Sequence, residues 1–557
     1  MSKFFKKIFM TISAAAASIS TAAAISAMAD WQNIGFMGDL NNDKLVSVSD
    51  MVIMTKYLLG EGFLTAENGY DTKGKKISVN GNEVFLSEDH LVTADINCDG
   101  RTDVYDLALM RKQLISNASF VVREWIDGIE TTTATAPSAA STVTTAASPQ
   151  KKFISPPIYD LYGSMPSQNR SEMAVFYVDF PDCRYSYDPS VQEIENVIFG
   201  AENSSDKNYP FESMSAFFDR SSKGAMELGG KVFRYTTKNK KSYYENDVWH
   251  VSLIDEIIGE FDSSVDFSQF DGDKDGVVDS ILVSVPSAAG DENWWAAAGT
   301  FGGDSRKRAD GMDIGHVIVG NSEIASATDH KDFNSSYIHE IGHCMGLPDY
   351  YLYDTEDFQG MHGSAGFEMM DDAICDFGAA SKLMLGWYTD DQLNIFSKGE
   401  TSRSFILNDA QSLSGNCVVI PCGDIDEKYR SEFLIVEYAT KNFNNESLKN
   451  EEWRATGSGI RVYHVDASEN GDLWYNTFKY ASGNDESDGG VNGRRFIRLV
   501  GEGDDYTDNL FKTSDVINSS VPGFSWYDVH GSQSIDTGIT VDVEFCDGNI
   551  CKITVTR

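Results

Sequence analysis

Residues 338–349 read Ile-His-Glu-Ile-Gly-His-Cys-Met-Gly-Leu-Pro-Asp and contain the pattern H-E-x-x-H. His339 and His343 are four residues apart, so on a helix both imidazoles lie on one face and can bind one metal ion. Zinc binds imidazole readily, and a catalytic zinc site keeps an open position for water. Glu340 lies beside this face and could take a proton from that water. The pattern therefore predicts a hydrolytic zinc site.

Two acidic residues are candidates for the third zinc ligand. Asp349 comes six residues after His343, and Gly346 allows the helix to end and the chain to turn back. Glu368 lies further along, at a distance that suits the glutamate ligand of a thermolysin-like site. We favour Asp349, because Gly346 supplies the turn and because Met370 follows where a methionine turn beneath the metal is expected.

Oxygen-bearing side chains form a second pattern, which occurs twice near the N-terminus, at 39–50 and 95–106. In both twelve-residue loops they occupy positions 1, 3, 5, 9 and 12, which is the arrangement of a calcium-binding loop. Apolar residues with helical spacing follow each loop, over 51–58 and 107–114. Position 6 is glycine in the second loop but Lys44 in the first, so we expect the first loop to bind calcium more weakly. The predicted calcium ligands are Asp39, Asn41, Asp43, Ser47 and Asp50 in the first loop and Asp95, Asn97, Asp99, Asp103 and Asp106 in the second.

This duplicated loop and helix resembles the dockerin type I module over about residues 36–118. The resemblance implies a small α-helical fold that depends on calcium and that binds a cohesin module of a cellulosome scaffoldin. It also implies that positions 10 and 11 of the two loops contact the cohesin. These residues are Val48, Ser49, Val104 and Tyr105. Between the loops, residues 77–85 have Asn80-Gly81 at their centre, which predicts a β-hairpin.

Length, charge and the N-terminal segment indicate an exported protein with several domains. The chain has 557 residues and a formal net charge of -40, which disfavours nucleic acid and anionic lipid as partners. Residues 1–29 carry early lysines, an apolar stretch and an Ala-Met-Ala cleavage site, so they predict a secretory signal. We therefore expect a secreted, extracellular protein without a membrane span. Whether Cys417 pairs with Cys422, and Cys546 with Cys551, stays open at this point.

We expect a multidomain protein with a small α dockerin module, an α/β zinc peptidase domain and a β-rich C-terminal domain. The boundaries are 1–29 for the signal, 30–120 for the dockerin module, 121–150 for a Thr/Ala/Ser-rich linker, 151–395 for the catalytic domain and 396–557 for the β-rich domain. Within the catalytic domain, apolar runs predict strands at 174–180 and 281–285 and helices at 211–218 and 253–261. Cys344 follows His343 directly, so it faces away from the ligand pair and is expected in the core.

A further calcium-type loop precedes the strand at 281–285. Its acids occupy positions 1, 3, 5 and 9, while position 12 is Leu282, which cannot bind a cation. We therefore expect a structural calcium site whose remaining ligands come from elsewhere in the chain. The predicted ligands are Asp271, Asp273, Asp275 and Asp279.

Residues 339–349, 366–371 and 385–387 together resemble the immune inhibitor A-type secreted metallopeptidases. The segments 178–182, 271–279, 432–437 and 457–466 match as well, and the resemblance spans roughly residues 170–510. It implies a metzincin-like catalytic domain with zinc, structural calcium, a methionine turn and endopeptidase activity.

These patterns predict a secreted zinc endopeptidase that acts on proteins or peptides and that is anchored to a cellulosome by its dockerin. Two other functions remain open from the sequence. One is a non-catalytic binding or adhesion component that keeps the peptidase fold, and the other is a zinc hydrolase of a non-peptide bond, such as a carbohydrate deacetylase.

Overall fold

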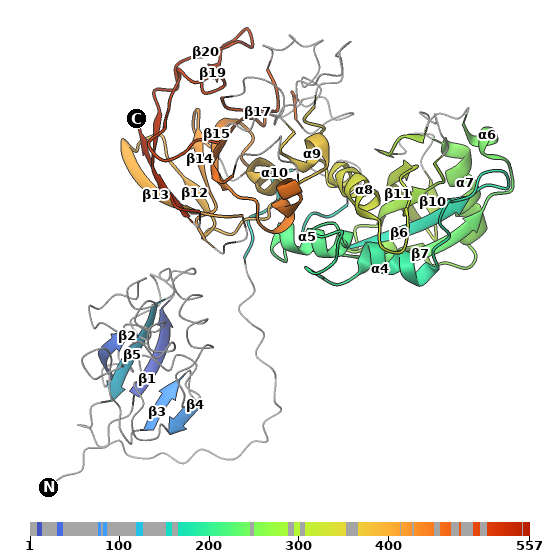
Figure 1. Ribbon diagram of the computed structural model, residues 1–557, viewed down its shortest axis with the longest axis horizontal. Coiled ribbons are helices and arrows are strands. Elements are labelled where there is room, and N and C mark those ends of the chain that lie inside the picture. Colours follow the sequence, from blue (N-terminus) through green and yellow to red (C-terminus); the bar gives the residue numbers. More distant parts are fainter. Residues whose placement is uncertain are drawn as a thin grey trace. The chain divides into compact units, whose positions relative to one another are not determined.

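The computed structural model divides the chain into two compact units, Met1–Ser148 and Pro149–Arg557 (Figure 1). It describes five strands of the first unit. In the second unit it describes residues 152–557 except 159–164, 246–249, 288–293, 301–306, 352–365, 411, 413, 426–427, 451–456, 469–477, 481–493, 502–509 and 549. None of the helices among these residues is both long and apolar enough to cross a membrane.

The first unit contains a five-stranded sheet in the order β2-β5-β1-β3-β4. The strands are β1 (Ile8–Ser13), β2 (Trp31–Phe36), β3 (Lys76–Val79), β4 (Asn82–Phe85) and β5 (Ser119–Trp125). β3 and β4 pair antiparallel with Val79 opposite Asn82, which confirms the hairpin predicted around Asn80-Gly81. β1 lies within the segment predicted to be a secretory signal, and removal of that segment stays a prediction. The two calcium loops, their helices and residues 126–150 of the linker lie outside the described residues. The boundary predicted at 120/121 is wrong, because Ser119–Trp125 form β5, which pairs with β1 and β2.

A six-stranded sheet forms the first part of the second unit, in the order β10-β11-β8-β6-β7, with β9 also paired to β11. Its strands are β6 (Asn169–Asp179), β7 (Met226–Thr236), β8 (Val277–Ser284), β9 (Ala297–Thr300), β10 (Arg308–Ala309) and β11 (Met312–Gly320). β7, β6, β8 and β11 are parallel, whereas β9 and β10 run antiparallel to β11. Residues 173–179 of β6 are buried on both faces, which is typical of a central parallel strand.

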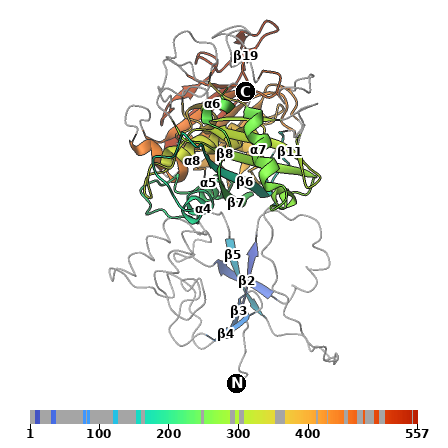
Figure 2. The ribbon, with the colours of Figure 1, turned by 90° about the vertical axis from the view of Figure 1, so that its right-hand side faces the viewer.

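Helices cover both faces of this sheet (Figure 2). α4 (Val191–Phe199), α5 (Met214–Ser222) and α8 (Lys331–Cys344) pack on one face, in a core that contains Val175 and Tyr177 of β6. α6 (Lys241–Tyr244), α7 (Val251–Phe261) and the 3-10 helix η2 (Phe267–Phe270) pack on the other face, with Phe176 and Val178. The expected mixed α/β architecture is thus confirmed. The helix expected from residue 211 begins only at Met214, because the Ser213 hydroxyl accepts a hydrogen bond from the Ala216 N–H and caps it.

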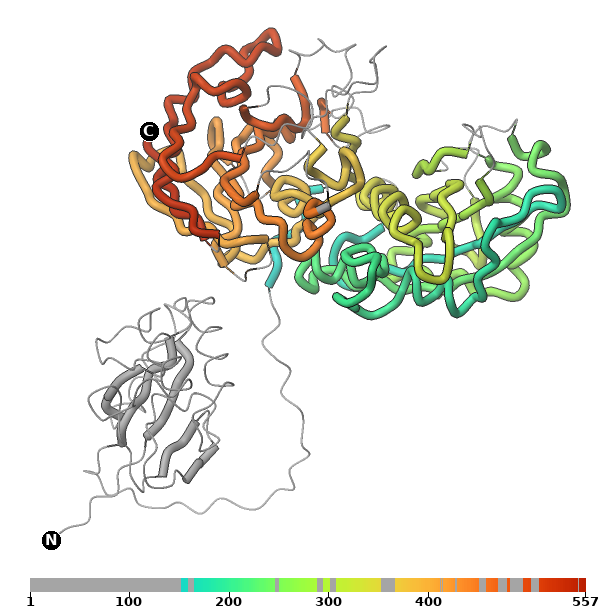
Figure 3. Tube along the Cα trace, in the orientation of Figure 1, coloured from blue at the N-terminus to red at the C-terminus, as the bar shows by residue number. Residues whose placement is uncertain are grey.

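Two sheets form most of the C-terminal part, as expected for a β-rich segment. One has the order β12-β14-β15-β16-β17 and the other β13-β22-β21-β18, with β19 and β20 as a separate pair. The strands are β12 (Leu393–Ile395), β13 (Ser402–Asn408), β14 (Cys417–Pro421), β15 (Glu432–Ala439), β16 (Gly459–Asp466), β17 (Ile497–Leu499), β18 (Val516–Ile517), β19 (Trp526–Tyr527), β20 (Gln533–Ile535), β21 (Thr540–Cys546) and β22 (Ile550–Thr556). β22, at the chain end, pairs with β13 (Figure 3). Cys546 and Cys551 form a disulfide between β21 and β22, while Cys417 and Cys422 are free.

The C-terminal strands share their core with the first part of the unit. One face of β14, β15 and β16 packs against the second sheet, through residues such as Val418, Leu434 and Val462. The opposite face, which includes Ile435 and Tyr463, joins the same core as helix α8 and the helices α9 (Met369–Asp372) and α10 (Ala379–Met384). The core is therefore continuous across residue 395, where the sequence suggests a domain boundary.

Candidate metal centre

Helix α8 carries His339, Glu340 and His343 and is held against the parallel sheet by its apolar face. Ile338 and Ile341 are fully buried on that face, and so is Cys344, as its position beside His343 predicts. The helix ends at Cys344, and Gly346 adopts a φ of 100°, a left-handed conformation that favours glycine. Hydrogen bonds from the Gly346 and Leu347 N–H groups to the last turn close this end, so the chain folds back toward the histidines.

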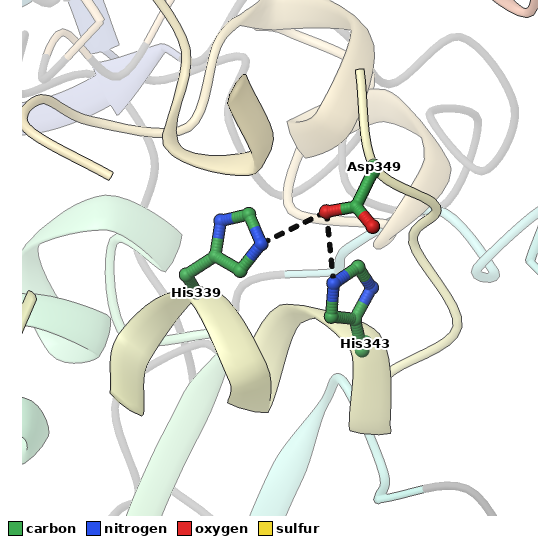
Figure 4. A group of neighbouring side chains, drawn as sticks. All are labelled: His339, His343 and Asp349. Carbon is green, nitrogen blue, oxygen red and sulfur yellow. Dashed lines mark hydrogen bonds and ion pairs between the residues drawn. The ribbon is translucent and has the colours of Figure 1, made fainter. Parts of the chain in front are cut away.

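The folded-back segment brings Asp349 to the two histidines (Figure 4). Asp349 Oδ1 lies 3.0 Å from His339 Nε2 and 3.1 Å from His343 Nε2. One ligand atom from each of the three residues lies within 4.8 Å of the others. Zinc ligands at ordinary distances in a tetrahedral site are about 3.3 Å apart, so these three residues fit a zinc ion.

Each histidine is oriented by a backbone carbonyl. His339 Nδ1 lies 2.8 Å from the Met369 carbonyl, and His343 Nδ1 lies 2.7 Å from the Leu347 carbonyl. A carbonyl can only accept a hydrogen bond, so both Nδ1 atoms carry the proton and both Nε2 atoms face Asp349. This arrangement matches that of metal-binding histidines, which bind through one ring nitrogen and donate from the other.

The charges of the three side chains are strongly coupled. Burial alone would lower the pKa of His343, but the Asp349 carboxylate beside it raises that pKa to about 9. Burial would raise the pKa of Asp349, but the charge of His343 and the hydrogen bonds from both histidines hold it well below its usual range. Without a metal, protons on the imidazoles therefore balance the carboxylate. Zinc would replace these protons, so its affinity should fall as the pH falls.

Glu340 is 6% exposed and is close enough for its charge to raise the pKa of both histidines. Within the described residues, the Glu340 carboxylate forms no hydrogen bond. A buried carboxylate that is not engaged elsewhere can accept a proton from a molecule bound at the three ligands.

The segment that begins at Gly366 passes beneath helix α8. The Met370 carbonyl accepts a hydrogen bond of 2.9 Å from the N–H of Tyr350, the residue after Asp349. The Met370 side chain is fully buried directly under Gly342, where an added Cβ would lie 2.3 Å from Sδ. The structure thus places Met370 beneath the turn of α8 between His339 and His343, and its role as a methionine turn stays a prediction.

Gly342→Ala tests this contact. A helix favours alanine over glycine by about 1 kcal/mol, but overpacking a rigid core costs about 1–3 kcal/mol. We expect Gly342→Ala to lower the free energy of unfolding in the wild-type chain and to raise it in a Met370→Ala background, because the smaller side chain leaves room. Urea unfolding of the four chains measures this change of sign, and the same effect in both backgrounds would contradict the contact.

Glu368, the other candidate for the third ligand, lies outside this cluster. Its carboxylate is fully buried and accepts hydrogen bonds from the Met370 N–H at 2.6 Å, from the Gly378 N–H at 2.9 Å and from the Ser381 hydroxyl. The structure therefore favours Asp349 as the third ligand.

The acidic loop before β8 brings three of its four predicted ligands together. Asp271, Asp273 and Asp275 offer carboxylate oxygens within 4.8 Å of one another. Asp279 is separate, because its carboxylate accepts hydrogen bonds from the N–H groups of Gly272 and Glu172. Burial raises the pKa of Asp279 to about 8. Asp279 thus connects the loop to β6 through these hydrogen bonds, while the other three acids lie nearer the surface.

Several predicted site residues lie outside the described part of the chain. They are the ten dockerin calcium ligands and the four cohesin-contact residues Val48, Ser49, Val104 and Tyr105. The carbonyls of Met369 and Leu347 are the site groups that the sequence did not predict. A backbone carbonyl belongs to every residue type, so no pattern of residue types marks them.

Comparison with known proteins identifies one part of the chain. Residues 37–115 match the model of the dockerin type I domain. The chain carries a dockerin type I domain. Type I dockerin domains bind calcium and cohesin modules, and they occur in secreted components of cellulosomes. No curated protein is significantly similar to the chain, and the dockerin match does not extend to the unit Pro149–Arg557, which contains the candidate metal centre.

Proposed function

We propose that this protein is a secreted zinc-dependent endopeptidase whose dockerin domain attaches it to a cellulosome scaffoldin. The observation that carries the proposal is the convergence of His339, His343 and Asp349 on one point, with the buried Glu340 beside them. Two imidazoles and one carboxylate leave the open coordination position that a hydrolytic zinc site needs.

The residues around the site have separate roles in peptide hydrolysis. A zinc ion at the three ligands would supply a Lewis acid that activates water and polarises a carbonyl group. Glu340 would accept the proton of the attacking water and then donate it to the leaving amine. The Met369 and Leu347 carbonyls keep both imidazoles in the orientation and tautomer that metal binding requires.

Strand β9 offers a surface on which an extended peptide could bind. It pairs with β11 along one edge, and among the described residues no strand pairs with its other edge. Ala296, the residue before β9, lies close to helix α8, since a Cβ added to Gly320 would contact both Ala296 and Tyr337. A peptide that adds to such an edge as a further strand is held mainly by backbone hydrogen bonds, which suits an endopeptidase with broad specificity.

A peptide-library digest tests the proposed activity. The full chain without its signal should bind one zinc ion at the catalytic site and cleave internal peptide bonds, which mass spectrometry identifies. A chelator should abolish cleavage, and added zinc should restore it. Bound zinc without cleavage of any library peptide would overturn the proposal and would support a non-catalytic role or a different substrate.

The attachment has a separate test. Calcium orders dockerin loops, so we expect binding to type I cohesins in calcium and its loss on chelation with EGTA. Asp99→Ala, in the loop that has the usual glycine, should weaken binding more than Asp43→Ala in the other loop. Calorimetric titration against a panel of cohesins measures both effects, and equal losses for the two variants would contradict the predicted difference between the loops.

A further inference from the structure

We propose that Glu368 is a positioning residue for the metal centre, because it holds the turn that orients His339 and Asp349. The inference rests on the zinc site of the proposed function. Glu368 is not a ligand of that site, and we assign it a role in holding the ligands in place.

Glu368 accepts three hydrogen bonds from the chain segment beneath helix α8. Its side chain is fully buried, and one oxygen accepts a hydrogen bond from the Met370 N–H. The other oxygen accepts hydrogen bonds from the Gly378 N–H and the Ser381 hydroxyl. Glu368 thus joins the turn at Met369–Met370 to the start of helix α10.

The two carbonyl groups of this turn accept hydrogen bonds from a metal ligand and from the residue next to another ligand. The Met369 carbonyl accepts the hydrogen bond from His339 Nδ1, and the Met370 carbonyl accepts one from the N–H of Tyr350, next to Asp349. A second connection runs through Ser381, whose Oγ lies 2.7 Å from the Tyr350 hydroxyl. A shift of the turn would therefore move one imidazole and the carboxylate ligand together.

Only a carboxylate satisfies all three donors. Two of them are backbone N–H groups that approach opposite oxygens of Glu368. A glutamine of nearly the same size would place its own NH₂ group against one of these donors and leave a buried N–H unsatisfied. Burial raises the pKa of Glu368 to about 7, and the hydrogen bonds from the three donors offset part of the cost of burying the charged carboxylate.

Glu368→Gln is the test, with Glu437→Gln as the matched control. Glu437 is a half-buried glutamate of β15 that pairs with Arg461 at 3.6 Å and accepts a hydrogen bond from the Ala379 N–H. Within the described residues it forms no hydrogen bond to the turn or to the ligands. Both variants should lower the unfolding temperature of the full chain. Only Glu368→Gln should weaken zinc binding, by about tenfold to a hundredfold, in competition with a chromophoric chelator. It should also change the visible spectrum of the Co²⁺-loaded protein.

A milder pair covers the case in which Glu368→Gln does not fold. Ser381→Ala removes one donor to Glu368 and the link to Tyr350, whereas Ser221→Ala removes a buried hydrogen bond to Asp376. Ser381→Ala should weaken zinc binding, and Ser221→Ala should leave it unchanged. Zinc affinity and Co²⁺ spectra that stay the same as wild type in the folded Glu368 or Ser381 variant would overturn the inference. Because these measurements do not involve turnover, a chain that binds zinc but cleaves no peptide would contradict the proposed function alone.

Discussion

Glu340→Gln is expected to lower kcat/KM for peptide cleavage by about 10²–10⁴-fold, while the protein still binds zinc. The substitution keeps the size of the side chain but removes the group that accepts the proton of the attacking water. His339, His343 and Asp349 are unchanged, so the metal-binding geometry should remain. Turnover of a fluorogenic peptide found in the library digest, together with zinc content by mass spectrometry, measures both parts of the prediction.

Asp332→Asn is the matched control for this variant. Asp332 is an exposed acid in the first turn of the same helix, so it shares the chain segment and the charge change but not the site. The Asp332→Asn variant should cleave the peptide at the wild-type rate. If Glu340→Gln retained more than a tenth of the wild-type kcat/KM with full zinc occupancy, Glu340 would not be the proton acceptor.

Asp376→Ala is expected to lower the free energy of unfolding by about 3–5 kcal/mol, the usual cost of breaking a buried ion pair. Asp376 Oδ2 lies 2.6 Å from Lys382 Nζ, and the two side chains are 4% and 1% exposed. Asp376 Oδ1 accepts hydrogen bonds from Ser221 of α5 and from Asn444 of the 3-10 helix η5 (Phe443–Asn450). The substitution would leave a buried lysine without its counter-charge and three elements without their common acceptor.

Glu400→Ala provides the comparison. Glu400 pairs with Arg403, but these side chains are 34% and 47% exposed, so solvent screens the pair and its loss should cost less than about 1 kcal/mol. Urea unfolding of the two variants and the wild type measures the difference. A cost below 1 kcal/mol for Asp376→Ala would mean that this buried polar contact does not stabilise the junction between the α/β part and the C-terminal strands.

Local patterns in the sequence determined the features that depend on neighbouring residues. The spacing of His339 and His343 places them on one helical face, because a helix turns every 3.6 residues. The Asn80-Gly81 pair predicts a hairpin for an equally local reason, since two-residue hairpin turns need backbone conformations that asparagine and glycine adopt easily. The two calcium loops likewise carry their ligands within twelve residues, and the dockerin match covers both.

Contacts between distant residues were decided only by the tertiary structure. Asp349 and Glu368 were both chemically suitable third ligands. The turn at Gly346 brings Asp349 back to the histidines, and the packing of Met370 under Gly342 fixes the position of the segment that contains Glu368. Asp279 has the same chemistry as Asp271, yet its burial directs it to backbone N–H groups of Gly272 and Glu172. The core shared by helix α8 and strands β14–β16 also required the fold, because an apolar pattern shows that a face is buried but not what it packs against.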